Sequence, residues 1–112
     1  MKRLVTLLFS ALLFAQVRSV TLTWVDGVNP TGTTYNVYRA PGACSVITNT
    51  YVKINTSAVA ALTYIDTTVV PGIYCYAVTA VSGTPPLEST LSMQVNAVIM
   101  TTPPVSITLK AQ

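Results

Sequence analysis

The sequence contains no histidine and little charge, and both features limit what the protein can do. Its 112 residues include six Lys or Arg and three Asp or Glu. Without histidine, the commonest general base of enzymes and the commonest metal ligand are missing. The sequence also lacks a Gly-rich phosphate loop, a nucleophile elbow and a Cys-x-x-Cys pair. These absences predict a non-enzyme that holds no metal and no cofactor.

The N-terminus has the pattern of a secretory signal peptide, residues 1–19. A basic head (Lys2–Arg3) precedes an apolar run (Leu4–Ala15), and Val17 and Ser19 are small residues at the −3 and −1 positions of a cut after Ser19. Cleavage after Ala15 is the alternative. The apolar run is shorter than the ~20 residues of a spanning helix, which favours export over an uncleaved membrane anchor. We therefore expect a secreted protein, periplasmic or extracellular, with no membrane span after cleavage.

The net charge of +3 belongs to the leader. Lys2, Arg3 and Arg18 all lie within residues 1–19. The rest of the chain balances three basic residues against three acidic ones: Arg39, Lys53 and Lys110 against Asp26, Asp66 and Glu88. Because a neutral surface does not attract polyanions, we expect no nucleic-acid partner.

Two cysteines, Cys44 and Cys75, remain after the leader. In an exported chain, such a pair predicts one disulfide. The alternative is a reactive or metal-binding pair. The lack of histidine and of a Cys-x-x-Cys spacing disfavours a zinc site.

Short alternating stretches between turn residues predict an all-β protein. The clearest one spans residues 72–81 after a Pro-Gly turn, and its alternation places Tyr74, Tyr76 and Val78 on one face. The other expected strands are residues 20–24, 35–39, 51–55, 62–66 and 91–99. In the last of these, Met93, Val95 and Ala97 are expected to lie on one face. Short strands at this spacing are typical of an antiparallel β-sandwich.

Four motifs in order resemble a fibronectin type III domain, of the bacterial rather than the animal kind, over residues 20–100. They are Val20-x-Leu22-x-Trp24, Tyr35-x-Val37-Tyr38-Arg39, Tyr64-x-Asp66-x-x-Val69 and Pro71-Gly72-x-Tyr74-x-Tyr76-x-Val78-x-Ala80. The resemblance implies an immunoglobulin-like antiparallel β-sandwich with sheets A-B-E and C′-C-F-G. Strand A is missing, because the chain after cleavage would begin at strand B. The implied core residues are Leu22, Trp24, Tyr35, Val37, Tyr64, Tyr74, Tyr76 and Val78.

The same topology implies two structural contacts. The hydroxyl of Tyr74 would bond backbone in the E–F connection, as a tyrosine corner. Cys44, in the C–C′ loop, and Cys75, on the outer face of strand F, would lie at one end of one sheet, within reach of a disulfide.

The function that the resemblance implies is that of an exported, non-enzymatic module for adhesion, spacing or protein–protein interaction at the cell surface or outside the cell. The alternatives are a carbohydrate-associated accessory or binding module and a subunit that self-assembles by strand addition. The partner is an unidentified protein or glycan. The candidate binding residues lie in the B–C and F–G loops: Asp26, Val28, Asn29, Thr84, Leu87 and Glu88.

Asp26 and Glu88 also raise the question of catalysis, because the two loops share one end of such a domain. A carboxylate pair can hydrolyse a glycosidic bond. We favour a simpler interpretation, in which Asp26 is a turn residue before Gly27 and Glu88 is a solvated loop charge.

Residues 101–112 form a Pro-containing tail. After Pro103–Pro104 the sequence alternates again over Val105–Leu109, which predicts an extra strand or the start of a second module. Without strand A, the edge of strand B would be unpaired. The tail could cover this edge in its own domain, or be donated to a neighbour and build a homo-oligomer.

Overall fold

The computed structural model describes residues 18–45 and 49–101, and that part of the chain is all β, with no helix. Most of the leader and the tail strand lie outside these residues. The strands are β1 (Val20–Thr23), β2 (Thr34–Pro41), β3 (Val52–Lys53), β4 (Thr63–Asp66), β5 (Gly72–Ser82), β6 (Leu87–Glu88) and β7 (Val95–Ile99). The expected strands are therefore present, in part with shorter bounds, and β6 lies where the sequence predicted only a loop.

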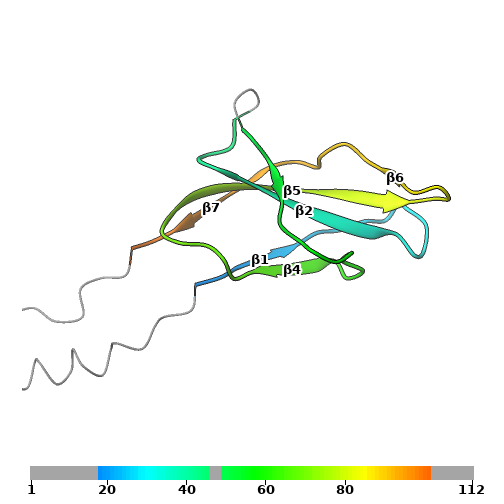
Figure 1. Cartoon of the computed structure of the whole chain (residues 1–112), viewed down its shortest axis with the longest axis horizontal. Coiled ribbons are helices and arrows are strands. Elements are labelled where there is room, and N and C mark those ends of the chain that lie inside the picture. Colours follow the sequence, from blue (N-terminus) through cyan, green and yellow to red (C-terminus); the bar gives the residue numbers. More distant parts are fainter. Residues whose placement is uncertain (1–17, 46–48, 102–112) are drawn as a thin grey trace, which may run out of the picture.

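The strands form two antiparallel sheets (Figure 1). β1 pairs with β4 in the smaller sheet, where Val20 lies opposite Asp66. The larger sheet has the order β3-β2-β5, and the far edge of β5 pairs with both β6 and β7. β2 and β5 form the longest ladder, from Thr34 opposite Val81 to Pro41 opposite Tyr74. This ladder contributes side chains to each of the cavities described below.

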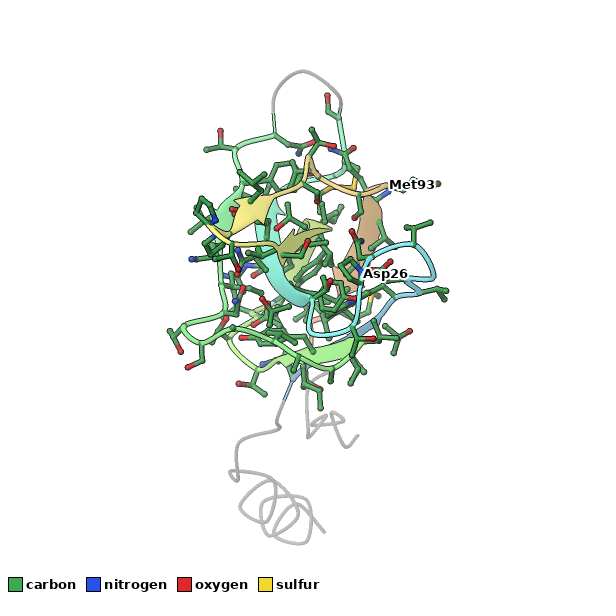
Figure 2. All side chains as sticks on the ribbon, turned by 90° about the vertical axis from the view of Figure 1, so that its right-hand side faces the viewer. Asp26 and Met93 are labelled. Atoms are coloured by element: carbon green, nitrogen blue, oxygen red, sulfur yellow. A yellow bond between two sulfur atoms is a disulfide. The ribbon has the colours of Figure 1, made fainter. Side chains whose placement is uncertain are left out.

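Both sheets contribute side chains to one hydrophobic core, which Figure 2 shows end-on. Its buried centre consists of Val37, Val69 and Tyr76. Partly buried side chains pack around this centre: Val20, Leu22, Trp24, Ile54, Tyr64, Tyr74, Val78, Ala97 and Ile99. Tyr35 is also buried, and its ring meets that of Trp24 edge-on, with centroids 5.4 Å apart. The alternation of β2 and β5 thus aims one side of each strand at the core.

The opposite face of β5 is buried too, although the sequence assigned it to the outside. Cys75, Ala77 and Thr79 are all buried there. Cys44 forms the predicted disulfide with Cys75, with a Cα–Cα distance of 4.9 Å, and the Tyr51 hydroxyl lies 3.1 Å from the sulfur of Cys75. Cys44 and Tyr51 therefore both contact the outer face of the larger sheet at Cys75.

Tyr74 fixes the turn into β5. Its hydroxyl donates to the Val70 carbonyl and accepts from the Val70 N–H, both at 3.1 Å. This is the contact expected of Tyr74 with the connection before its strand. These hydrogen bonds tie the ring to backbone four residues earlier, and so they restrict the path of the chain between β4 and β5.

Asp66 joins the two sheets. It lies at the end of β4 with its side chain 2% exposed, and one carboxylate oxygen accepts from Arg39 of β2 and Tyr76 of β5, both at 2.7 Å. The other oxygen accepts from the Thr68 N–H (3.0 Å) and hydroxyl (2.7 Å). Burial alone would raise the pKa of Asp66, but these hydrogen bonds lower it to about 2.

The last expected strand is divided. Between β6 and β7, residues 89–94 lie opposite only residues 77–80 of β5, so this segment carries two extra residues. The extra residues break the alternation, as in β-bulges. The expectation that Met93, Val95 and Ala97 share one face therefore holds only within β7, where Val95 and Ala97 lie two residues apart. Met93 precedes β7 and is 91% exposed, and Val95 is 52% exposed. Ala97 does pack on the core, together with Ile99.

Candidate functional site

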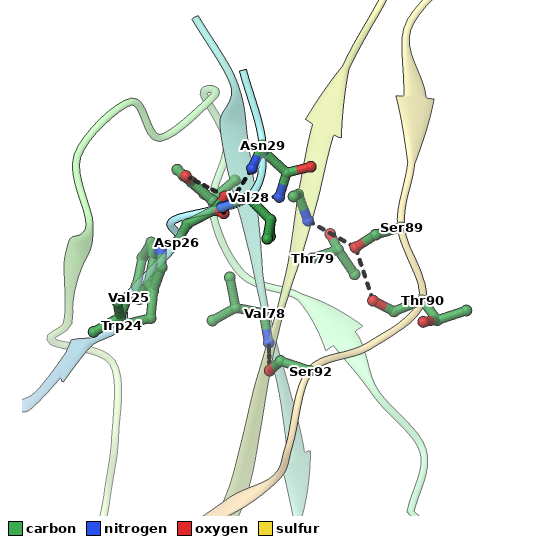
Figure 3. A pocket seen from close by; sticks show the side chains of 12 residues that line it. Trp24, Val25, Asp26, Val28, Asn29, Val78, Thr79, Ser89, Thr90 and Ser92 are labelled. Carbon is green, nitrogen blue, oxygen red and sulfur yellow. Dashed lines mark hydrogen bonds between the residues drawn. The ribbon is translucent and has the colours of Figure 1, made fainter. Parts of the chain in front are cut away.

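A cavity of about 230 Å³ lies between the β1–β2 connection and the divided edge of the larger sheet (Figure 3). One wall is formed by five residues of the connection: Trp24, Val25, Asp26, Val28 and Asn29. Ser89, Thr90 and Ser92 form the facing wall, and Val78 of β5 lies between the two walls. The cavity therefore joins a loop near the start of the described chain to a segment near its end.

Asp26 organises the loop wall of this cavity. Its carboxylate accepts the backbone N–H groups of Val28 and Asn29 at 3.1 Å, and the Asn29 amide and Tyr35 hydroxyl at 2.7 Å. Hydrogen bonds from Asn29 and Tyr35 lower the pKa of Asp26 to about 2, and Asp26 raises the pKa of Tyr35. With four donors on one carboxylate, Asp26 is a turn residue that anchors the loop to β2, as one sequence interpretation held.

The anchored loop presents apolar side chains to solvent. Val25 is 94% exposed and Val28 92% exposed, and both line the cavity. Met93 follows Ser92 of the opposite wall, and Figure 2 shows it on the same side of the molecule as Asp26. We call Val25, Val28 and Met93 the apolar rim. Neither Val25 nor Met93 was among the residues expected to bind a partner.

The wall that faces the loop is held by two serines. Ser89 N–H donates to the Ala80 carbonyl, and the Ala80 N–H donates to the Ser89 hydroxyl at 2.9 Å. Ser92 repeats this arrangement with both backbone groups of Val78. Each serine hydroxyl thus accepts the β5 N–H that a backbone carbonyl would accept in regular pairing, at a point where an extra residue interrupts the pairing. The two serines are visible in the sequence. That their hydroxyls bond β5 backbone, however, depends on how this segment is aligned with β5.

A second cavity, of about 510 Å³, lies on the outer face of the larger sheet. Tyr38 and Tyr51 line it together with Glu88 of β6. One oxygen of Glu88 accepts from the Tyr38 hydroxyl (2.5 Å), the Thr79 hydroxyl (2.6 Å) and the Asn36 amide (3.2 Å). Hydrogen bonds from Thr79, Tyr38 and Asn36 hold the pKa of Glu88 below its usual value, and Glu88 raises the pKa of Tyr38. Glu88 is therefore a fixed acceptor on the sheet, not the solvated loop charge that was expected.

Asp26 and Glu88 lie on opposite faces of the larger sheet. Asp26 bonds Tyr35, whereas Glu88 bonds Asn36, the next residue of β2. Successive side chains of a strand point to opposite faces. The two carboxylates therefore do not face one substrate, and the carboxylate pair considered from the sequence is not assembled.

The six residues expected to bind a partner do not form one site. Asp26, Val28 and Asn29 line the first cavity, and Glu88 lines the second. Thr84, in the turn between β5 and β6, and Leu87, in β6, are exposed and line neither. The residues that sequence reasoning missed at these sites are Val25, Tyr38, Tyr51, Ser89, Ser92 and Met93.

Within residues 18–45 and 49–101, no three His, Cys, Asp or Glu side chains gather in a way that could hold a metal ion. In the same ranges, no helix has the length and apolar character needed to cross a membrane. Comparison with protein-family models and with curated protein sequences found no match to this chain.

Proposed function

We propose that the protein is an exported, non-enzymatic binding module of the fibronectin type III kind, acting in adhesion or protein–protein interaction outside the cell. The strand pairing supports this fold: β1-β4 and β3-β2-β5 with β6 and β7 correspond to the implied orders B-E and C′-C-F-G. The Tyr74 hydroxyl on Val70 backbone supports it as well. An experimental structure in which the strands pair in another order would contradict the fold.

Export is supported by the disulfide between Cys44 and Cys75. Disulfides persist in oxidising compartments and are rare in the cytosol. The leader pattern of residues 1–19 points to the same compartment.

The observation that carries the binding function is the apolar rim. Val25, Val28 and Met93 are each more than nine-tenths exposed. The two valines line the first cavity, and Met93 follows Ser92 of its opposite wall. Exposed apolar groups that gather on one surface mark interaction sites. The hydrogen bonds to Asp26 hold the loop before any partner arrives, which reduces the entropy lost on binding. The occupant of this surface would be a protein with an apolar contact area.

An adhesion assay tests this proposal. Beads coated with the unaltered chain should adhere to cells that secrete it, and a Val25→Ser/Val28→Ser variant should lose most of this adhesion. A matched control, Val52→Ser/Val98→Ser, changes two exposed valines on β3 and β7 and should adhere normally. Equal adhesion by both double variants would refute a role for the rim. Failure of the unaltered beads to adhere would refute the adhesive function.

A second candidate function is saccharide binding at the outer-face cavity. Tyr38 and Tyr51 flank the fixed carboxylate of Glu88 there. Small-molecule sites combine aromatic walls with a few fixed polar groups in this way. Binding of the unaltered chain on a glycan array, lost on Tyr51→Ala but kept by the rim variant, would favour this function. No bound glycan on the array would remove it.

A further inference from the structure

The outer edge of β1 is open in the described part of the chain. β1 pairs with β4 alone, and the ladder continues to Trp24, whose N–H donates to the Leu62 carbonyl at 3.0 Å. Backbone groups along an antiparallel strand alternate between its two sides. The N–H and C=O groups of Thr21 and Thr23 therefore point away from β4. An unpaired row of this kind is a template for another strand.

A groove runs along this edge. A cavity of about 310 Å³ separates β1 from residues 92–95 and is lined by the apolar parts of Leu22, Trp24, Tyr76 and Val78. Val95 lies on the same face of β7 as Ala97 and Ile99 yet is 52% exposed, because nothing described covers it here. The core thus opens to solvent between the two sheets.

Trp24 carries an unpaired donor beside the groove. Its indole Nε1 is buried and has no hydrogen-bond partner among the described residues. Buried indole N–H groups normally find an acceptor. Trp24 itself lines the groove, so the residue with the unpaired indole is one that an occupant of the groove would contact.

The chain itself carries a segment that fits. Val20 lies opposite Asp66, and a short connection leads from Asp66 to Gly72, which lies opposite Ile99. The end of β7 and the beginning of β1 are therefore at the same end of the molecule, as Figure 1 shows. From Thr101, four extended residues reach ~13 Å, enough to cross the ~10 Å between packed sheets.

We propose that this groove is a strand-acceptor site and that its occupant is the chain's own C-terminal segment, residues 104–110. Entering beside Val20, the segment runs parallel to β1. Val105, Ile107 and Leu109 face the apolar groove, and the Ser and Thr residues between them face solvent. Coverage within one chain is favoured over donation to a neighbour, because a short linker gives a high effective concentration. This inference does not depend on the proposed function.

Amide hydrogen exchange on the full chain tests the pairing without any substitution. If the segment occupies the groove, the amides of Thr21 and Thr23 exchange at least 100-fold more slowly than unstructured amides. Exchange of both amides at the unstructured rate would overturn the proposal.

Tryptophan fluorescence identifies the occupant, since Trp24 is the single tryptophan of the chain. Ile107→Asp places a charge on the face of the segment that meets the groove, and Thr108→Asp places it on the other face. The first variant should show red-shifted emission and at least two-fold stronger quenching by acrylamide. The matched variant should behave like the unaltered chain. Identical spectra for all three would overturn the proposal, and a dimer by light scattering that Ile107→Asp dissociates would replace self-coverage with donation.

Discussion

Replacing Asp66 with alanine removes the carboxylate that joins the two sheets. Four donor groups on three residues then lose their acceptor: the Arg39 guanidinium, the Tyr76 hydroxyl, and the backbone N–H and hydroxyl of Thr68. Truncating one member of a buried ion pair costs about 3–5 kcal/mol. The guanidinium of Arg39 is 25% exposed and regains some water, so we expect a loss near the lower end of that range.

The pH dependence of stability gives a second measure of how much the Asp66 carboxylate stabilises the fold. The folded protein holds the pKa of Asp66 at about 2, below its ordinary value of 3.8. A lowered pKa stabilises the fold above the ordinary value, and this contribution is lost as the pH falls through the folded value. Since one pKa unit corresponds to about 1.4 kcal/mol, roughly 2 kcal/mol should disappear between about pH 5 and pH 2. In Asp66→Asn this part of the pH dependence should vanish.

Urea unfolding followed by Trp24 fluorescence measures both effects. A loss of 3 kcal/mol moves the midpoint by about 2–3 M, if the slope is near 1–1.5 kcal/mol/M. A double-mutant cycle with Tyr76→Phe provides the control: removing this hydroxyl should cost much less when Asp66 is already alanine. The reasoning would be refuted by a cost below 1 kcal/mol for Asp66→Ala together with an additive cycle.

Three further predictions concern other contacts. Cys44→Ser/Cys75→Ser opens a crosslink with a sequence separation of 31 and should cost about 3–4 kcal/mol in urea, whereas the unreduced protein should show no free thiol; two thiols would contradict the disulfide. Tyr74→Phe removes both bonds to Val70 and should cost about 1–2 kcal/mol, more than Tyr64→Phe, whose hydroxyl makes one 3.3 Å bond to Ile54; an equal cost would contradict the special role of Tyr74. Glu88→Gln removes the charge that raises the pKa of Tyr38, so one of the six tyrosines should ionise at lower pH by ultraviolet absorbance, and an unchanged titration would contradict that contact.

Much of the scaffold could be predicted because its causes are local. The alternation of residues 72–81 determines which side chains of β5 share a face, whatever β5 packs against. The two cysteines could pair only with each other once an oxidising compartment was assumed. The contact of Tyr74 with Val70 also lies within a few residues of chain.

The candidate site could be predicted only in part, because its residues meet through pairing between distant strands. Asp26 lies in the β1–β2 connection and Glu88 in β6, and the alternation of β2 separates them onto two faces. The exposure of Met93 depends on two extra residues opposite β5, which no local pattern reveals.

The sequence by itself therefore determined most of the strands, the alternation of β5 and the disulfide, since each follows from near neighbours or from a single choice of partner. Only the tertiary structure decided which carboxylates share a face, where the apolar rim gathers and that the edge of β1 opens onto a groove. These features depend on the register between strands that lie up to about 50 residues apart in the chain, as between Asn36 and Glu88.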